Sequence, residues 1–340
     1  MTKTFDFVAI GDAVTDAFIR LKEAEVHCTI NHENCEICLP FATKIPYESV
    51  TVVPAVGNSP NAACAAARLG LQTALITNIG ADTNGQEILS TLDREQIDSR
   101  FVTKHAEHKT NYHYVLWYED DRTILIKHED YPYQFPNLDA PRWIYLSSLG
   151  EHTSEYHQAI EKYLVANPEI KLAFQPGTFQ MKMGTEALAG IYKRTEIFFC
   201  NMEEAKRILQ IETKEKANDV TIKDLLVKIH ELGPKIVVIT DGPNGAHALA
   251  DGDPPTGGWF MPPYPDPKPP LERTGAGDAF SATVTAALVL GESLETALRW
   301  GPINSMSVVQ DIGAQRGLLT RAKLEEYLQK AAADYQPRHI

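Results

Sequence analysis

The chain has 340 residues, 44% of them hydrophobic and 23% charged, which is enough for one large core or a core with a small appendage. The formal net charge is −13 and no cluster of Lys and Arg forms a basic stripe, so the composition argues against a nucleic-acid partner. No apolar run is long enough to cross a bilayer, and residues 1–6 lead into a strand instead of a signal sequence, so we expect a single cytoplasmic domain over residues 1–340 with no membrane partner.

Short apolar runs recur along the chain and indicate buried strands at residues 5–11, 50–56, 73–79, 143–146, 170–174, 197–200 and 235–240. Helical patterns separate most of them, at residues 61–69, 85–96, 154–165, 186–192, 203–210 and 221–232. This alternation predicts an α/β fold with a doubly wound, mostly parallel sheet and helices on both faces. Ligands of such folds bind at the carboxyl ends of the strands.

Three stretches depart from the alternation. Residues 21–47 are polar and irregular, while residues 111–118 and 122–128 are two β-rich arms of a hairpin. Together they predict a small separate sheet; the alternative is a hairpin at the edge of the main sheet. Residues 251–270 contain eight Pro and three Gly, which excludes a helix or a central strand and predicts a wrapped surface loop.

The polar stretch also carries five potential soft metal ligands within 12 residues, namely His27, Cys28, His32, Cys35 and Cys38. Cys35 and Cys38 have Cys-x-x-Cys spacing, which suits zinc, but a second such pair is missing. A metal site, a reversible thiol pair and an ordinary surface segment all remain open for these residues.

Near the C-terminal end, Gly275, Ala276 and Gly277 precede Asp278 and an apolar helix of small residues at 279–288. Small residues let backbone N–H groups turn toward one point at a helix N-terminus, where unpaired amides and the macrodipole favour an anion such as phosphate. Asp278 lies in the first turn, so a bound phosphoryl group and a proton acceptor would lie side by side. The alternative is an ordinary capped helix after a glycine turn.

A second segment far upstream has a related pattern. Gly57 ends a strand and is followed by an Ala-rich helix that contains Asn61 and closes at Gly70. Together the two segments resemble the two signatures of the ribokinase-like (PfkB-type) carbohydrate and nucleoside kinases, in the right order and over nearly the whole chain. The resemblance implies a ribokinase-like fold in which a small β lid, built from about residues 17–50 and 108–130, covers the substrate.

The resemblance implies ATP- and Mg²⁺-dependent phosphoryl transfer to a hydroxymethyl group of a sugar or nucleoside. Asp278 matches the catalytic base of the family, and Gly275, Ala276 and Gly277 match its anion hole. Glu272 stands where several relatives help to hold a monovalent cation such as K⁺, although Glu-Arg replaces the usual Asp-Thr there.

Asn201 and Glu204 match the Asn-x-x-Glu motif of the family, which organises Mg²⁺ and phosphates largely through water. The same spacing is typical of a capping box at a helix N-terminus, which is the alternative.

Further cofactor contacts are implied on the nucleotide side. Thr240, Gly242 and Gly245 belong to a segment similar to the one that contacts ribose and phosphates, although a strand followed by a β-turn has the same appearance. Where relatives often carry Asn or His beside the adenine this chain has Pro302, and Asn304 is two positions away. The proline-rich loop at 251–270 is expected near the nucleotide.

On the acceptor side, the resemblance places Asp16 against substrate hydroxyls, because a carboxylate accepts two O–H bonds from a vicinal diol. Gly57 and Asn61 match the family's substrate motif, although Val56 replaces its first Gly. Asp12 is a weaker candidate for the same site, since it could simply cap a turn.

These assignments predict a neutral acceptor with a vicinal diol. Residues 176–178 and the Tyr and His residues of the lid favour a nucleoside over a free hexose, because a base offers a face for stacking. A kinase for a phosphorylated sugar is the alternative and would need lid cations such as Lys109, Arg122 or Lys127. A second alternative is a catalytically silent sugar-sensing protein, but the intact motif around Asp278 argues against it. The lid commonly serves as a dimer contact in relatives. The resemblance therefore implies that two copies of this chain can pair through the lid.

Overall fold

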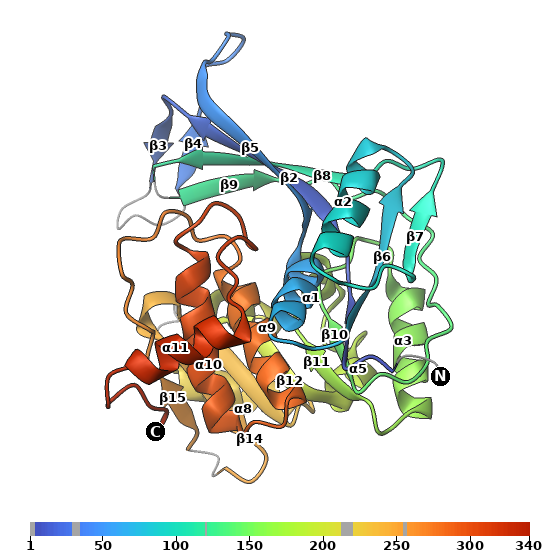
Figure 1. Cartoon of the computed structure of the whole chain (residues 1–340), viewed down its shortest axis with the longest axis vertical. Coiled ribbons are helices and arrows are strands. Elements are labelled where there is room, and N and C mark those ends of the chain that lie inside the picture. Colours follow the sequence, from blue (N-terminus) through green and yellow to red (C-terminus); the bar gives the residue numbers. More distant parts are fainter. Residues whose placement is uncertain (1–3, 29–34, 120, 212–219, 254–256) are drawn as a thin grey trace.

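The computed structural model describes residues 4–28, 35–119, 121–211, 220–253 and 257–340. Within these ranges the main sheet has ten strands in the order β16-β15-β14-β13-β12-β11-β10-β1-β6-β7 (Figure 1). The seven strands from β13 to β7 in this order pair in parallel with their neighbours. Strands β14, β15 and β16 add antiparallel pairs at the other end. The strands are β1 (Phe7–Ile10), β6 (Thr73–Gly80), β7 (Val102–His105), β10 (Trp143–Leu146), β11 (Lys171–Phe174), β12 (Thr195–Asn201), β13 (Ile236–Thr240), β14 (Ala246–Ala250), β15 (Trp259–Met261) and β16 (Arg338–His339).

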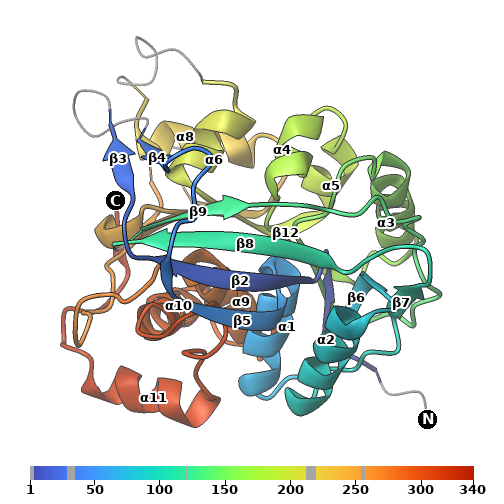
Figure 2. The same ribbon diagram turned by 90° about the horizontal axis from the view of Figure 1, so that it is seen from above.

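Helices cover both faces of this sheet, as the alternating pattern predicts (Figure 2). In β1, Phe7 and Ala9 contribute to one apolar cluster while Val8 and Ile10 contribute to the other, because successive side chains of a strand point to opposite faces. The first face carries α1 (Asn58–Arg68), α2 (Thr83–Arg94), α9 (Ala276–Val289), α10 (Leu294–Val308) and α11 (Arg321–Lys330). The second carries α3 (Ser154–Ala166), α4 (Thr178–Met183), α5 (Ala189–Arg194), α6 (Met202–Ile208) and α8 (Ile222–His230).

A separate sheet, here called the lid sheet, lies beside the main sheet and has the order β5-β2-β8-β9 (Figure 1). Its strands are β2 (Val14–Leu21), β5 (Tyr47–Val56), β8 (Asn111–Tyr118) and β9 (Asp121–Leu125). Phe18, Val53 and Val115 form its inner core and pack against Ile312 of the main body. The hairpin at 111–128 therefore belongs to this sheet and not to an edge of the main sheet.

The prediction that residues 50–56 form a strand of the main sheet is wrong. This apolar run belongs to β5, a ten-residue strand that pairs antiparallel with β2 in the lid sheet. The first part of β5 is solvent-exposed and only its end is buried, so this run of Val residues does not mark a strand covered on both faces.

The Cys-x-x-Cys spacing is also misleading. Strands β3 (Glu25–His27) and β4 (Glu36–Cys38) form an antiparallel hairpin in which Glu25 faces Cys38, and the next positions along this register bring Cys28 and Cys35 together as a disulfide. Cys38 is a free thiol. Cys35 is thus bonded to Cys28 and not to Cys38. His32 lies outside the described residues. No group of three His, Cys, Asp or Glu side chains in the described ranges is placed to hold a metal ion.

Other boundaries differ in detail. The proline-rich stretch at 251–270 contains the short strand β15, because residues 257–261 carry no Pro and can pair with β14 and β16. The helix predicted at 186–192 is displaced to α5, and α4 precedes it as a separate short helix. Among the helices that the structure describes, none has the length and apolar composition of a membrane span.

Candidate active site

Helix α9 begins at the turn that the sequence singles out. Gly275 is its N-cap and has a left-handed backbone, with φ of 80°. A Cβ atom at this position would lie 2.6 Å from the Cα of Ala314, so only glycine allows the turn to pack here. The first N–H groups of a helix have no partner within it, and here they belong to residues 276–278. A helix N-terminus of this kind favours an anion.

Asp278 projects from this first turn into a group of three side-chain amides. Asn58 Nδ2 and Gln175 Nε2 donate to its Oδ1 over 3.0 and 3.1 Å, and Asn61 Nδ2 donates to its Oδ2 over 2.8 Å. The donors come from the start of α1 and from the segment after β11, so two segments far from Asp278 in the sequence position its carboxylate.

Two further residues orient these amides. Tyr145 donates to Gln175 Oε1 over 2.5 Å, which leaves the amide nitrogen of Gln175 for Asp278. Gln315 Nε2 donates to Asn61 Oδ1 over 3.1 Å and to the carbonyl oxygen of Ala55 over 2.6 Å. Asn61 was predicted to bind substrate, and one of the two N–H groups of its amide donates to Asp278 in the structure.

Burial raises the pKa of Asp278, while the amides of Asn61, Gln175 and Asn58 and the positive charge of Arg122 act in the opposite direction. Arg122 belongs to β9 of the lid sheet, and its Nε lies 3.3 Å from Oε1 of Glu272. A raised carboxyl pKa is common for a general base, because the group then holds the proton that it accepts more readily.

Glu272 is only 2% exposed and lies just before the anion-binding turn. Its Oε1 accepts the backbone N–H of Thr274 over 2.6 Å, while its Oε2 is buried without a hydrogen-bond partner among the described residues. A buried carboxylate oxygen of this kind fits a cation.

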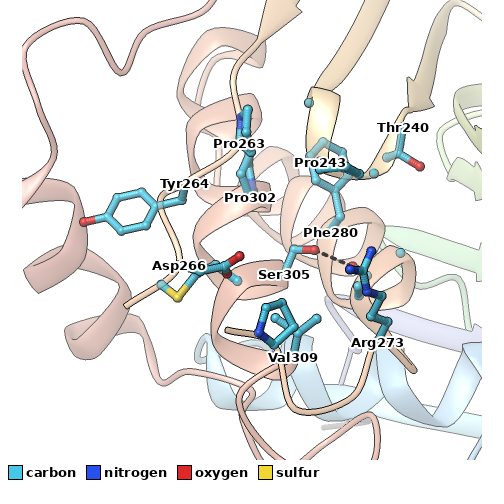
Figure 3. A pocket seen from close by; sticks show the side chains of 16 residues that line it. Thr240, Pro243, Pro263, Tyr264, Asp266, Arg273, Phe280, Pro302, Ser305 and Val309 are labelled. Carbon is cyan, nitrogen blue, oxygen red and sulfur yellow. Dashed lines mark hydrogen bonds between the residues drawn. The ribbon is translucent and has the colours of Figure 1, made fainter. Parts of the chain in front are cut away.

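A cavity of about 360 Å³ opens beside the start of α9 (Figure 3). The cofactor candidates Thr240, Gly242 and Gly245 line it together with Ala276 and Gly277 of the turn. The 3₁₀ turn η1 (Gly242–Asn244) follows β13 directly, so backbone groups of this loop face the cavity from the carboxyl edge of the sheet. The remaining lining residues are Pro243, Pro263, Tyr264, Asp266, Pro270, Arg273, Phe280, Pro302, Ser305, Met306 and Val309.

The far walls of the cavity are largely apolar, which suits a nucleobase. Pro302 lies in this wall within α10, while Asn304 is fully buried and bonded to Thr283 Oγ1 and to the backbone N–H of Leu319. Asn304 is therefore part of the helix packing and does not face the cavity. Ser305 donates to the carbonyl oxygen of Ala276 over 2.9 Å, which ties α10 to the turn (Figure 3).

Asn201 and Glu204 form a complete capping box at the start of α6, with both reciprocal hydrogen bonds at 2.9 Å. Asn201 is also the β12 partner of Thr240, which lines the cavity. Burial raises the pKa of Glu204, and the negative charge of Asp278 raises it further. The two carboxylates therefore interact electrostatically. The capping role is present, and it leaves Glu204 next to the site.

The acceptor-side carboxylates lie where β1 passes into the lid sheet. Asp12 is 3% exposed and accepts the Tyr133 hydroxyl at both oxygens, over 2.8 and 2.9 Å, while His128 Nδ1 lies 3.0 Å from its Oδ2. Asp16 is on β2, and its Oδ1 lies 3.4 Å from His113 Nδ1 of β8. Asp12 is thus largely satisfied by protein partners, whereas Asp16 is not.

The backbone around Gly57 is equally constrained. Gly57 has φ of 119°, and a Cβ atom there would lie 2.7 Å from the carbonyl oxygen of Asp12. Val56, at the departure from the family motif, packs with Val14 and Phe18 in the lid-sheet core.

Sequence reasoning missed Asn58, Gln175 and His128, and it considered His113 and Tyr133 only as aromatic side chains for stacking on a base. Asn58 lies within the predicted motif and could have been found there, because a side chain three positions before Asn61 lies on the same face of a helix. The others come from loops and lid strands that carry no motif, and only the tertiary structure brings them to the carboxylates.

A carboxylate held at a helix N-terminus, next to a cavity with an apolar wall and a glycine-rich turn, has the parts of a phosphotransferase that acts on an alcohol. Comparison with known proteins agrees. Residues 24–321 match the pfkB family of carbohydrate kinases. The ribokinase of Bacillus subtilis is 27% identical over 280 residues, which cover 80% of this chain and 87% of that protein.

Solved structures share the fold. The nucleoside kinase of Methanocaldococcus jannaschii superposes with a TM-score of 0.77 at 19% identity, over 96% of this chain and 99% of that one. The ribokinase of Arabidopsis thaliana, whose structure contains ribose and ATP, superposes with a TM-score of 0.76 at 20% identity and the same coverage. The chain belongs to the pfkB family of carbohydrate kinases and has the ribokinase-like fold that its sequence predicts.

Proposed function

We propose that this kinase transfers the γ-phosphoryl group of ATP to a hydroxymethyl group of a neutral sugar or nucleoside, with Asp278 as the general base. The observation that carries the proposal is the position of Asp278, held by three amides at the start of α9. Ala276 and Gly277 of the same turn line the cavity proposed for the nucleotide.

In this mechanism Asp278 accepts the proton of the attacking hydroxyl, and its three amide partners keep the carboxylate oriented toward that hydroxyl. The backbone N–H groups of Gly277 and Asp278, which have no acceptor among the described residues, stabilise the negative charge of the transferring phosphoryl group. Both groups belong to one helical turn, so the proton acceptor and the anion site keep a fixed separation.

ATP is proposed to occupy the cavity, with its base against the apolar wall and its phosphates toward Thr240, Gly242 and Gly245. The cavity's composition supports this orientation, and the Arabidopsis ribokinase structure contains ATP. Mg²⁺ is proposed to be held through water by Glu204, whose Oε1 has no hydrogen bond among the described residues. Bound there, the ion would neutralise phosphate charge.

A monovalent cation is proposed at Glu272, because its buried Oε2 lacks a partner. Arg122 already supplies a positive charge at the other oxygen, so we expect only a partial dependence on K⁺. Titration with KCl against choline chloride at constant ionic strength tests this, and equal rates in both salts would exclude the site.

The acceptor is proposed to be neutral because carboxylates dominate its side of the site. Of the lid cations named for a phosphorylated sugar, Lys127 is exposed and paired with Glu129 over 2.5 Å, and Arg122 is held by Glu272. An anionic acceptor bound by Lys127 or Arg122 would have to break one of these pairs, and any anionic acceptor would approach Asp16 and Asp278.

The test compares ribose, fructose, adenosine, inosine and fructose 6-phosphate at equal concentration with ATP and Mg²⁺, by coupled detection of ADP. We expect a neutral sugar or nucleoside to be turned over fastest. Preference for fructose 6-phosphate would overturn the neutral acceptor, and no turnover of any acceptor would favour the silent sensing protein.

A homodimer through the lid sheet is part of the proposal. On its outer face Val52, Ala17, Tyr114 and Leu125 follow one another across the four strands, and Val52, Tyr114 and Leu125 are about half exposed. An apolar row on an open sheet face is typical of a protein contact. Analytical ultracentrifugation of the wild type and of Val52→Lys tests it; a monomeric wild type would exclude the dimer.

A further inference from the structure

Buried polar atoms without a hydrogen-bond partner gather where β2 and β8 begin. In the described ranges these atoms include Asp16 Oδ1, Asn111 Nδ2 and His113 Nε2. Such atoms are rare in folded proteins, because leaving one unpaired costs about 1–3 kcal/mol. Three in one place indicate that a bound molecule supplies the missing partners.

The register of the two strands places these three side chains on one face. Asp16 is paired with His113 and Val14 with Asn111 in parallel strands, so positions 14, 16, 111 and 113 share the inner face of the lid sheet. Val14 and Val115 of the same face pack in the lid-sheet core. The unpaired atoms therefore face the body of the protein and not solvent.

Close contacts, and not a hydrogen bond, position the ring of His113. Its Nδ1 lies 3.4 Å from Asp16 Oδ1, and the two side chains are only 12% and 10% exposed. Its ring lies 5.2 Å from the ring of His128, which is itself held by Asp12 over 3.0 Å. This arrangement leaves Nε2 as the free atom of His113. Asn111 is held by a hydrogen bond, because its Oδ1 accepts the backbone N–H of Glu129 over 2.7 Å.

The chemistry of the three atoms identifies their partner. The carboxylate oxygen of Asp16 only accepts hydrogen bonds, the amide nitrogen of Asn111 only donates, and His113 Nε2 does either according to its tautomer. A hydroxyl group both donates and accepts, so a row of neighbouring hydroxyls pairs with all three. A phosphate or carboxylate would be repelled by Asp16.

Resting on the proposed kinase function, we propose that His113 binds an acceptor hydroxyl through Nε2, next to the hydroxyl bound by Asp16. His113 is then a specificity-determining residue, and the acceptor is a ring with adjacent hydroxyl groups. The family motifs assign no role to this histidine, and the sequence pattern suggests only stacking on a base, not a hydrogen bond to a hydroxyl.

Two substitutions of His113 separate this role from a structural one. The amide of His113→Asn can replace Nδ1 and keep the contact with Asp16, but it does not extend to the position of Nε2. His113→Gln is longer and extends its amide to about that position. A structural role predicts that Asn replaces His better than Gln does, whereas the proposed role predicts the reverse.

We expect His113→Asn to raise the KM of the best acceptor of the panel about tenfold or more, with the KM for ATP unchanged. His113→Gln should recover most of this loss. His27→Asn is the matched control, since His27 of β3 has a side chain that is 64% exposed and, within the described residues, forms its side-chain hydrogen bond with exposed Glu25 alone. Thermal melting of each variant checks that the fold is retained.

Deoxy analogues give the second readout. Adenosine is compared with 2′-deoxyadenosine and 3′-deoxyadenosine, or ribose with 2-deoxyribose and 3-deoxyribose, in the wild type and in His113→Asn. If His113 binds a hydroxyl, removing that hydroxyl and removing the ring nitrogen disrupt one interaction, so the two losses in kcat/KM do not add. Fully additive losses for both analogues would overturn the inference.

The outcomes distinguish the two proposals. A wild-type protein that phosphorylates no acceptor refutes the proposed function. A wild-type protein that is active, with His113→Asn as active as wild type or more active than His113→Gln, refutes only the role of His113.

Discussion

Replacing Asp278 by Asn removes the proton acceptor while keeping the size of the side chain. In the wild type three amide groups donate to the carboxylate over 2.8 to 3.1 Å. In the variant the new amide nitrogen must face at least one of these donors, and Asn61 cannot turn freely because Gln315 holds its oxygen. Two N–H donors that face each other without an acceptor cost about 1–3 kcal/mol of stability.

A second effect offsets this cost. Burial raises the pKa of Asp278, so the folded protein binds this proton more tightly than the unfolded chain does. Its contribution to stability is favourable at low pH and is lost as the pH rises from the ordinary value through the raised pKa of the folded protein. At neutral pH the partly buried carboxylate therefore destabilises the fold, and Asn removes that penalty. We expect a net change in stability that is small compared with the change in rate.

The rate should fall at least about a hundredfold, which corresponds to about 2.7 kcal/mol in the activation free energy. The assay measures kcat by coupled ADP release with the best acceptor of the panel, while ADP binding is measured by calorimetry and unfolding by thermal melting. Nucleotide affinity should stay near that of the wild type. A variant with the kcat of the wild type would refute Asp278 as the base, and a variant that no longer folds would refute the balance of energies given above.

Two further substitutions test the surroundings of Asp278. Glu204→Gln should raise the Mg²⁺ concentration needed for half-maximal rate, because the carboxylate that orders the water of the ion is lost, and the acceptor KM should change little. An unchanged Mg²⁺ titration would leave Glu204 with its capping role alone. Arg122→Gln should move the acid limb of the kcat profile to higher pH, because the positive charge of Arg122 lowers the pKa of Asp278. Rates measured from acid to neutral pH that follow the wild-type profile would show that Arg122 does not act on the base.

Local sequence patterns were sufficient for six of the ten main-sheet strands that the structure describes, and they missed β7, β14, β15 and β16. Strand β10 occupies the predicted residues 143–146, and β6 and β13 differ from their predicted ranges by one residue at one end. A parallel strand covered on both faces must be apolar throughout, so it is visible as a continuous run. The run at 50–56 has the same composition but is covered on one face only, and composition cannot distinguish the two cases.

The motif around Asp278 was also visible, because a glycine turn followed by a helix is a local structure. Gly275 with its φ of 80° needs no distant contact to be recognised. By contrast, Gln175 is 103 positions away from Asp278 and Asn58 is 220 positions away, and polar residues of this kind occur in many loops without such a role.

The sequence by itself therefore determined the alternation of strands and helices, the helix start that carries Asp278, and the family to which the chain belongs. The tertiary structure alone decided which amides hold Asp278 and that the lid brings Arg122 to Glu272. It also decided that His113 lies beside Asp16 with a nitrogen that has no hydrogen-bond partner in the described part of the chain. The physical reason is that backbone conformation depends on neighbours in the chain. The partners of a buried charge depend instead on which distant segments the fold packs around it.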